Sequence, residues 1–273
     1  MGEITLKLRD LRFAFDTPIG MVSVVDGTNF DIESGQFLAI VGESGSGKSM
    51  TALAIMGLLP SAAEVSGSIE LTGREISDLS DNELEDVRGA EMGMVFQEPM
   101  TSLNPVLTVR RQMTEGLIRH RRLSRSAAEV IATSALSEVE ITDPDRVMKL
   151  YPHQLSGGMR QRVMIASALT LEPLLLIADE PTTALDVSVQ AQVLELLVAL
   201  KKRRDAGILL ITHDIGVVAE SADHVVVMRE GKILETGPVD QVIFSPRHEY
   251  TRNLLAAHIS LASPRARSVV AEP

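Results

Sequence analysis

Cysteine is absent from the 273-residue chain, which excludes disulfides, thiolate metal sites and iron–sulfur clusters. Long apolar runs are missing too, because the longest, residues 50–59, is about half of what a bilayer crossing needs. The N-terminus MGEITLKLRD has no apolar stretch of the signal-peptide kind. These absences lead us to expect a globular chain in the cytosol.

Positive charge is in short supply. The chain has 26 Lys and Arg against 37 Asp and Glu, a formal net charge of −11. A protein that binds nucleic acid non-specifically needs a basic surface, so we expect no nucleic-acid partner, although a local basic site stays open. Apolar residues make up 45% of the chain, which is enough to bury a substantial core and is not typical of a disordered chain.

Hydrophobic patterning predicts an α/β fold. Alternating apolar residues predict strands at residues 4–8, 13–15 and 30–32, and wholly apolar runs predict buried strands at 37–41, 174–178 and 208–212. Further strands are expected at 68–71 and 92–96, and a hairpin at 225–237 that turns at Glu230 and Gly231. Helical patterns span 107–171, with a break near 142–144, and 187–202. Apolar strands that alternate with helices predict a parallel sheet covered on both faces.

A glycine-rich turn between strand 37–41 and the next helix fits the pattern G-x-x-x-x-G-K-[ST]. Its residues are Gly42, Glu43, Ser44, Gly45, Ser46, Gly47, Lys48 and Ser49. Glycines let the backbone approach phosphate oxygens, and the N–H groups at the start of a helix bind anions. We therefore expect Lys48 to reach the β- and γ-phosphates and Ser49 to bind Mg²⁺, with Met50 next to them. A glycine turn with a chance lysine is the alternative reading.

Two carboxylates follow the apolar run 174–178. Asp179 and Glu180 stand at the carboxyl end of this predicted strand, the edge at which open α/β sheets bind ligands. Such a pair on its own is more often simply solvated. Combined with the phosphate-binding loop, it predicts that Asp179 holds Mg²⁺ and that Glu180 is the general base for an attacking water.

A second helix start of the anion-binding kind lies in the segment LSGGMRQR, residues 155–162. Ser156 can cap a helix whose apolar face continues at Met159, Val163 and Ala166. Ser156, Gly157 and Gly158 therefore offer another phosphate-binding surface. The chain has no N-K-x-D guanine motif, which argues against a GTPase but leaves other P-loop enzymes open.

In these motifs the chain resembles the ATP-binding-cassette (ABC) ATPases over nearly its whole length. GESGSGKS matches the Walker A motif, LSGGMRQR the signature motif and LLLIADEP the Walker B motif. TALD at 183–186 matches the D-loop, Gln97 the Q-loop and His213 the switch histidine, all in the family's order. The resemblance implies one ABC ATPase domain at 1–259 with a P-loop core, an antiparallel β subdomain and a helical subdomain inserted at about 100–165, followed by a loose tail at 260–273.

The same resemblance implies site roles and cofactors. ATP and Mg²⁺ are the expected cofactors, with Gln97 touching Mg²⁺ and water, and His213 bound to the γ-phosphate; alone, such a histidine would more often be a core-edge residue without a role. Phe15 is expected to stack on adenine, with Phe13 as a substitute and plain strand packing as the alternative. Asp186 is expected to bridge two subunits.

The segments VFQEPMTSLNP and SPRHEYTRNLL look like those of the oligopeptide, dipeptide and nickel importer ATPases. The chain departs from that pattern where Glu249 replaces a usual proline, and in having no C-terminal cysteine cluster. The resemblance implies a head-to-tail pair with a second ATPase, identical or related, in which ATP lies between the P-loop of one subunit and Ser156, Gly157 and Gly158 of the other.

Two transmembrane permeases and an extracytoplasmic solute-binding protein are the further partners that the resemblance implies, at the cytoplasmic face of the inner membrane. The expected function is ATP-driven import of peptides, nickel or a related solute. Two alternatives stay open: a soluble ATPase of DNA repair or translation, and an accessory subunit of phosphonate C–P lyase. The chain has no room for the long insertions or second cassette usual in the former, and VFQEPMTSLNPVLTV favours the importer over the latter.

Overall fold

The computed structural model describes residues 2–18, 20–98, 102–181 and 187–262. Its strands are β1 (Ile4–Thr17), β2 (Gly20–Glu33), β3 (Phe37–Val41), β4 (Ala63–Leu71), β5 (Arg74–Glu75), β6 (Met92–Val95), β7 (Leu175–Asp179), β8 (Gly207–Ile211), β9 (His224–Arg229) and β10 (Lys232–Pro238). Its helices are α1 (Lys48–Ile55), α2 (Asp81–Val87), α4 (Val109–Arg121), α5 (Arg125–Glu138), α6 (Pro144–Val147), the 3-10 turn Pro152–Gln154, α7 (Gly157–Leu169), α8 (Val187–Arg204), α9 (Ile215–Ser221), α10 (Val239–Phe244) and α11 (Glu249–Ala262).

A six-stranded sheet in the order β10-β9-β3-β8-β7-β6 lies at the centre of the described chain. From β9 to β6 neighbouring strands run parallel, and β10 pairs antiparallel with β9 across the turn at Glu230 and Gly231. Every residue of β3, β7 and β8 is buried. The predicted parallel sheet and the predicted hairpin are thus both confirmed, and the apolar runs are explained by burial on two faces.

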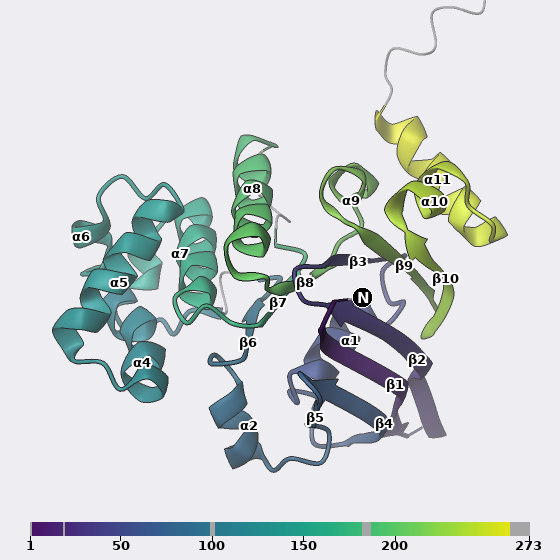
Figure 1. The fold of residues 1–273 in the computed structure, drawn as a ribbon, viewed down its shortest axis with the longest axis horizontal. Coiled ribbons are helices and arrows are strands. Elements are labelled where there is room, and N and C mark those ends of the chain that lie inside the picture. Colours follow the sequence, from purple (N-terminus) through teal and green to yellow (C-terminus); the bar gives the residue numbers. More distant parts are fainter. Residues whose placement is uncertain (1, 19, 99–101, 182–186, 263–273) are drawn as a thin grey trace, which may run out of the picture.

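Two hydrophobic layers cover this sheet. Along β3, Phe37, Ala39 and Val41 face the layer built with α7 and α8, while Leu38 and Ile40 face the layer built with α1 and the smaller sheet. This division follows from the two-residue period of side chains along a strand. Helices lie on one face of the central sheet and the antiparallel sheet lies on the other (Figure 1), so that β3, β7 and β8 are buried along their whole length.

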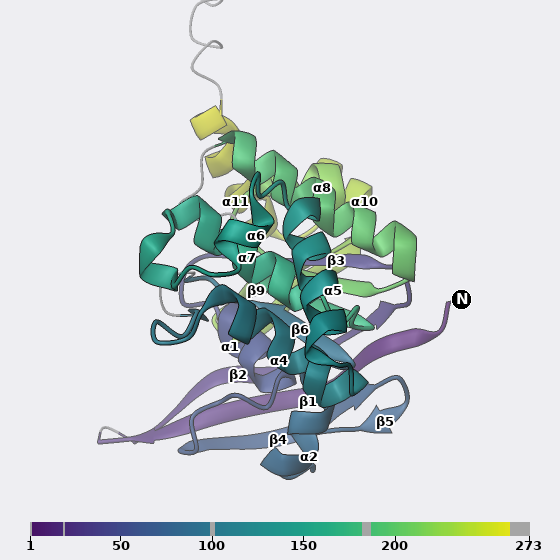
Figure 2. The same cartoon turned by 90° about the vertical axis from the view of Figure 1, so that its left-hand side faces the viewer.

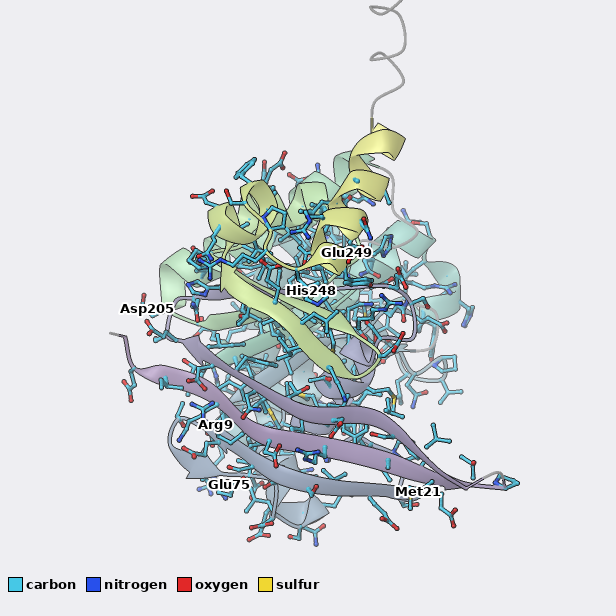
Figure 3. All side chains as sticks on the ribbon, turned by 90° about the vertical axis from the view of Figure 1, so that its right-hand side faces the viewer. Arg9, Met21, Glu75, Asp205, His248 and Glu249 are labelled. Carbon is cyan, nitrogen blue, oxygen red and sulfur yellow. The ribbon has the colours of Figure 1, made fainter. Side chains whose placement is uncertain are left out.

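The smaller sheet has the order β2-β1-β4-β5 and contains the N-terminal residues. The short alternating runs predicted there belong to two long strands, β1 and β2, which form an antiparallel hairpin with several register shifts. Figure 3 shows this hairpin extending to Met21 at its far end. An antiparallel β subdomain, as the resemblance implied, is therefore confirmed.

Helices α4 to α7 form a group beside the central sheet, inserted between β6 and β7 (Figures 1 and 2). Helices α4, α5 and α7 begin at capping side chains: Thr108, Ser124 and Ser156 each accept a hydrogen bond from the backbone N–H of the third residue of the helix. The helical region expected at 107–171 is confirmed. The expected break near 142–144 is confirmed as well, because α5 ends at Glu138 and α6 begins at Pro144.

The C-terminal helix α11 differs from the sequence-based expectation. A loose tail was expected from Ser260 onwards, but α11 continues to Ala262, so the prediction is wrong for residues 260–262; residues 263–273 lie outside the described part. Among the described helices, none combines the length and apolar character needed to cross a membrane.

The hairpin turn between β9 and β10 joins three parts of the fold. The Gly231 N–H donates to the Ser46 carbonyl at 3.0 Å, and the Gly231 carbonyl accepts from the Asp26 N–H at 2.9 Å. Gly231 has φ +77°, and a Cβ there would lie 2.3 Å from the Val24 carbonyl oxygen. Both the left-handed backbone and the close approach require glycine at this position.

We expect Gly231→Ala to lower the free energy of unfolding by about 2–4 kcal/mol, through left-handed strain and overpacking together. Urea unfolding followed by circular dichroism measures this change. Gly73→Ala is the matched control, because Gly73 has φ +79° but open space around its Cβ position, and it should lose only about 1 kcal/mol. Equal losses in the two variants would contradict the packing argument.

Candidate functional site

Strand order brings the sequence motifs to one edge of the central sheet. The phosphate-binding loop (residues 42–49) follows β3, His213 follows β8 by two residues, Glu180 follows β7 directly and Gln97 follows β6 by two residues. In the sheet these strands are neighbours in the order β3-β8-β7-β6 and run parallel. Their carboxyl ends therefore meet, as expected for a ligand site of an α/β sheet.

The phosphate-binding loop wraps around the ammonium group of Lys48. The Lys48 Nζ donates to the carbonyl oxygens of Gly42 and Glu43, both at 2.8 Å, and contacts the Ser46 Oγ at 3.3 Å. Lys48 is buried, and burial lowers its pKa from the ordinary value, while Glu180, Asp179 and Glu43 act in the opposite direction. The loop thus encloses the ammonium group of the first residue of α1.

Gly42 and Gly47 have backbone conformations that this loop needs. Gly42 has φ +156° and a Cβ there would lie 2.0 Å from the Met228 carbonyl oxygen, while Gly47, the N-cap of α1, has φ +100°. Ser44 and Gly45 are exposed in the same turn, and Met50 is half-buried in the first turn of α1. A glycine-rich turn that leads into a helix start is the backbone arrangement that binds phosphate groups in other proteins.

Asp179 is a buried carboxylate at the end of β7. Its Oδ1 accepts from the Ser49 Oγ at 2.9 Å, which directly joins two of the three predicted Mg²⁺ ligands. Burial raises the pKa of Asp179 to about 6; the Ser49 hydrogen bond and Lys48 lower it, and Glu180 raises it further. Burial of the carboxylate therefore outweighs the attraction of the nearby Lys48 ammonium.

Glu180 lies between Gln97 and His213. The Gln97 Nε2 donates to the Glu180 Oε2 at 3.1 Å, and the His213 Nδ1 lies 3.4 Å from the Glu180 Oε1. Glu180 has φ +43°, a left-handed conformation that is rare for glutamate, and its N–H donates to the Ile211 carbonyl at 2.8 Å. Strained backbone of this kind concentrates at functional sites.

His213 is positioned by its sequence neighbours. Asp214 caps α9 by accepting from the N–H groups of Gly216 and Val217, and its own N–H donates to the Thr212 Oγ1 at 3.0 Å. These contacts fix the turn that follows β8. The positioning roles of Thr212 and Asp214 were not predicted, although an aspartate directly before a helix is a recognisable capping signal.

The signature segment forms the start of α7. The Ser156 Oγ accepts from the Met159 N–H at 3.3 Å, which confirms the predicted cap. Ser156 and Gly157 are exposed, Gly158 is half-buried, and a Cβ at either glycine would meet no atom within 4 Å. Within this chain, packing therefore does not require glycine at these two positions.

Two interactions of the signature segment were not foreseen. The fully buried Gln161 donates through Nε2 to the carbonyl of Pro181, so that α7 is tied to the residue after Glu180. Arg160 donates to the Pro152 carbonyl at 2.7 Å and thereby braces the approach to the helix. His153, which lies just ahead of the signature segment, stacks on Tyr151.

The two aromatic residues considered for stacking on adenine differ in burial. Phe13 is 1% exposed and lies in the core between the two sheets, so the expectation that it could substitute for Phe15 is wrong. Phe15 is half-buried and packs at the edge of the same core. Asp186 lies outside the described residues.

The sequence profile of the ABC transporter family matches residues 25–183 of the chain. The chain belongs to the ABC transporter family. Its central sheet, antiparallel sheet and helical group are the parts of an ABC cassette, and the cassette is an ATPase. The resemblance stated on the motifs is thereby confirmed.

Among curated proteins, this cassette is 50% identical over 270 residues to the oligopeptide transport ATP-binding protein OppD of Bacillus subtilis, covering 98% of this chain and 75% of that protein. It is also 50% identical to the dipeptide transport ATP-binding protein DppD of the same organism, with 93% and 77% covered. The glutathione import ATP-binding protein GsiA of Escherichia coli K12 is 50% identical, and the match spans 92% of this chain but 42% of that protein.

Two solved structures have the same fold. The dimeric post-hydrolysis state of the ATP-binding cassette MJ0796, bound to ADP and Pi, matches with a TM-score of 0.78 at 30% identity and covers 86% of this chain and 98% of that one. CbiO1 of Clostridium perfringens, part of the ABC transporter complex cbiONQ, matches with a TM-score of 0.74 at 30% identity, covering 96% and 97%. The predicted fold class is confirmed.

The raised pKa of Asp179 gives the stability of the metal-free chain a pH dependence. The folded chain holds the Asp179 proton up to about pH 6, whereas the unfolded chain releases it near the ordinary value of 3.8. The folded state binds more protons in this interval, so the free energy of unfolding falls as the pH rises through it.

Asp179→Asn should remove this component and should stabilise the metal-free chain at pH 7 by about 1–3 kcal/mol. Urea unfolding in EDTA at several pH values measures the effect. Asp16→Asn, an exposed position on β1, is the control and should leave the pH profile unchanged. An Asp179→Asn profile that parallels the original chain would contradict the assignment.

Proposed function

We propose that this ABC ATPase drives the import of peptides or of a related solute, and that the residues brought to the sheet edge perform the hydrolysis. The catalytic proposal rests on one observation, the Glu180 carboxylate held between Gln97 and His213 beside the phosphate-binding loop. The solute class rests on the names of relatives that are 50% identical, which transport oligopeptides, dipeptides or glutathione.

In the proposed reaction, Glu180 accepts a proton from a water molecule as the water oxygen attacks the γ-phosphorus of ATP. The bond from that phosphorus to the β,γ-bridging oxygen breaks, and ADP and phosphate result. Gln97 orients the carboxylate and the water through its amide, and His213 binds the γ-phosphate. The Lys48 ammonium leaves the carbonyls of its own loop and binds the β- and γ-phosphates.

The chain offers a fitting site for Mg²⁺. Ser49 and Asp179 supply a hydroxyl and a buried carboxylate in direct contact, hard oxygen donors of the kind Mg²⁺ prefers. Within the described residues no cluster of three acidic or histidine side chains forms a metal cage, which fits an ion that takes its other ligands from nucleotide phosphates and water. Gln97 is a further ligand in this proposal. Bound Mg²⁺ would neutralise charge on the β- and γ-phosphates.

A second cassette completes the site in this proposal. Ser156 and Gly157 are exposed, and a Cβ at Gly157 or Gly158 would meet no atom within 4 Å. A head-to-tail partner would place these three residues on the γ-phosphate of the opposite chain, with Asp186 bridging the two subunits. Each hydrogen bond to a charged phosphate contributes about 1.5–3 kcal/mol. A few such bonds therefore reach the roughly 5.5 kcal/mol that shifts a two-state equilibrium from almost fully open to almost fully closed.

The adenine of the bound nucleotide would stack on Phe15 in this proposal. Phe15 is half-buried on β1. The neighbouring strand β2 contacts the phosphate-binding loop, where the Val25 Cγ2 lies 2.9 Å from the position of a Cβ on Gly47. The phosphate-binding loop, Phe15 and the signature segment of the second cassette would then contact ATP from three sides.

A groove between the central sheet and the helical group suits the permease partner. Its volume is about 440 Å³. It is lined by Phe96, directly before Gln97, and by residues of the helical group and α7, among them Leu103, Leu107, Glu115 and Leu171. In this proposal cytoplasmic helices of two permease subunits dock here, a solute-binding protein delivers the solute outside, and the cassette lies at the cytoplasmic face of the inner membrane.

Glu180→Gln should retain ATP binding and slow hydrolysis by about a hundredfold to ten-thousandfold, because the amide cannot accept the water proton. Calorimetry measures binding, phosphate release measures turnover, and light scattering should detect a dimer trapped by ATP. Glu220→Gln, an exposed change on α9, should behave like the original chain.

The double variant Glu180→Gln with Ser156→Arg separates closure from catalysis. The arginine fills the open helix start, so the variant should bind ATP and stay monomeric. A dimer trapped as efficiently as in the single variant would contradict the role of the signature segment, and unchanged turnover in Glu180→Gln would contradict the general base.

Glu115→Trp should abolish binding to the permeases, since Glu115 is exposed at the groove and a tryptophan there would fill it. A pull-down with the tagged chain from detergent-solubilised membranes, analysed by mass spectrometry, should recover two membrane-spanning subunits. The variant should not recover them but should retain its affinity for ATP. Glu220→Trp is the control. Permeases recovered equally well with both variants would contradict the docking site.

A further inference from the structure

The segment between α10 and α11 forms a tightly held corner. The Glu235 carboxylate of β10 accepts from the N–H groups of Arg247, at 2.8 Å, and His248, at 3.1 Å, and these bonds lower its pKa against the effect of burial. The His248 Nδ1 in turn accepts from the Tyr250 N–H at 3.1 Å. Figure 3 shows His248 and Glu249 at this corner, over β10. The corner fixes where α11 begins and how its first turn is oriented.

Tyr250, in the first turn of α11, points into the protein towards the phosphate-binding loop. Its side chain is 6% exposed, and the Arg229 guanidinium lies 4.8 Å from the ring centroid. The Tyr250 hydroxyl oxygen accepts a hydrogen bond from the Glu43 N–H at 3.2 Å. Burial raises the pKa of this phenol, so it stays neutral at physiological pH. A residue of the C-terminal helix therefore touches the nucleotide loop directly.

The peptide unit between Gly42 and Glu43 is held from both sides. Its carbonyl oxygen, on Gly42, accepts from the Lys48 Nζ at 2.8 Å, and its N–H, on Glu43, donates to Tyr250. When Lys48 turns to the phosphates of a nucleotide, the carbonyl loses this partner. Of the two hydrogen bonds that hold this peptide unit, the one to Tyr250 then remains.

We propose that Tyr250 is a positioning residue for ATP: its hydroxyl keeps the Gly42–Glu43 peptide unit in place when Lys48 transfers from the loop carbonyls to the phosphates. This proposal rests on the nucleotide site proposed above. A loop already fixed by α11 loses little conformational freedom on binding, and such preorganisation increases affinity. It also gives the segment SPRHEYTRNLL a part in the ATP site.

Tyr250→Phe tests the proposal because it removes one oxygen and retains the ring and its packing against Arg229. Without the hydroxyl, the peptide unit is untethered once Lys48 leaves, and the cost of ordering it appears in binding. The loss of one hydrogen bond corresponds to an affinity about three- to tenfold weaker. The melting temperature of the nucleotide-free chain should change little, since Lys48 still holds the loop in that state.

Isothermal titration calorimetry of the full chain with MgATP and with inorganic tripolyphosphate measures the effect. Tripolyphosphate has no adenine, so an effect confined to the phosphate loop should weaken both ligands by the same factor. Tyr151→Phe, at the chain's other tyrosine, 39% exposed and stacked on His153, is the matched control and should bind both ligands like the original chain.

Glu235→Gln provides a second, independent variant at the corner. Its amide nitrogen cannot accept from an N–H, so the support of α11 weakens, and MgATP affinity should fall by less than in Tyr250→Phe. If the original chain binds MgATP and both variants bind it equally well, the proposed role of Tyr250 is overturned. If the original chain does not bind MgATP, the nucleotide site itself is overturned instead.

Discussion

Parallel strand pairing is the constraint on which the structure of this cassette depends. Strands buried on both faces, such as β3, β7 and β8, can carry almost no polar side chains along their length. Charged groups are therefore confined to the last residue of such a strand or to the residues that follow it, and parallel pairing collects these residues at one edge. The sheet therefore brings together residues from distant parts of the sequence, namely Lys48, Asp179, Glu180 and His213.

Short sequence patterns predicted those parts of the site whose conformation depends on a few neighbouring residues. The phosphate-binding loop, the carboxylates after β7 and the Ser156 cap each depend on a short segment and a fixed conformation, so residue type and spacing were sufficient. The choice between Phe13 and Phe15 was beyond such reasoning. Both are aromatic and two residues apart on β1, and a register shift between Phe13 and Ala14 separates the buried ring from the half-buried one.

Contacts between distant segments could not be predicted from one sequence. Tyr250 reaches the Glu43 N–H across 207 residues, Gly231 bonds the carbonyl of Ser46, and Gln161 bonds that of Pro181. None of these residues belongs to a recognisable sequence motif for its contact. Each contact depends on how the two sheets and the helices pack against one another. The end of α11 was missed for a related reason: residues 260–262 lack an apolar period, but they continue a helix that is already formed.

The left-handed backbone of Glu180 has a consequence for the evolution of this protein. Glycine or asparagine would adopt φ +43° more readily than glutamate, so the fold alone favours another residue at this position. Selection for thermal robustness without selection for turnover would therefore tend to replace the carboxylate. A glutamate at this position fits the general-base role proposed for Glu180, in which some stability is given up for activity.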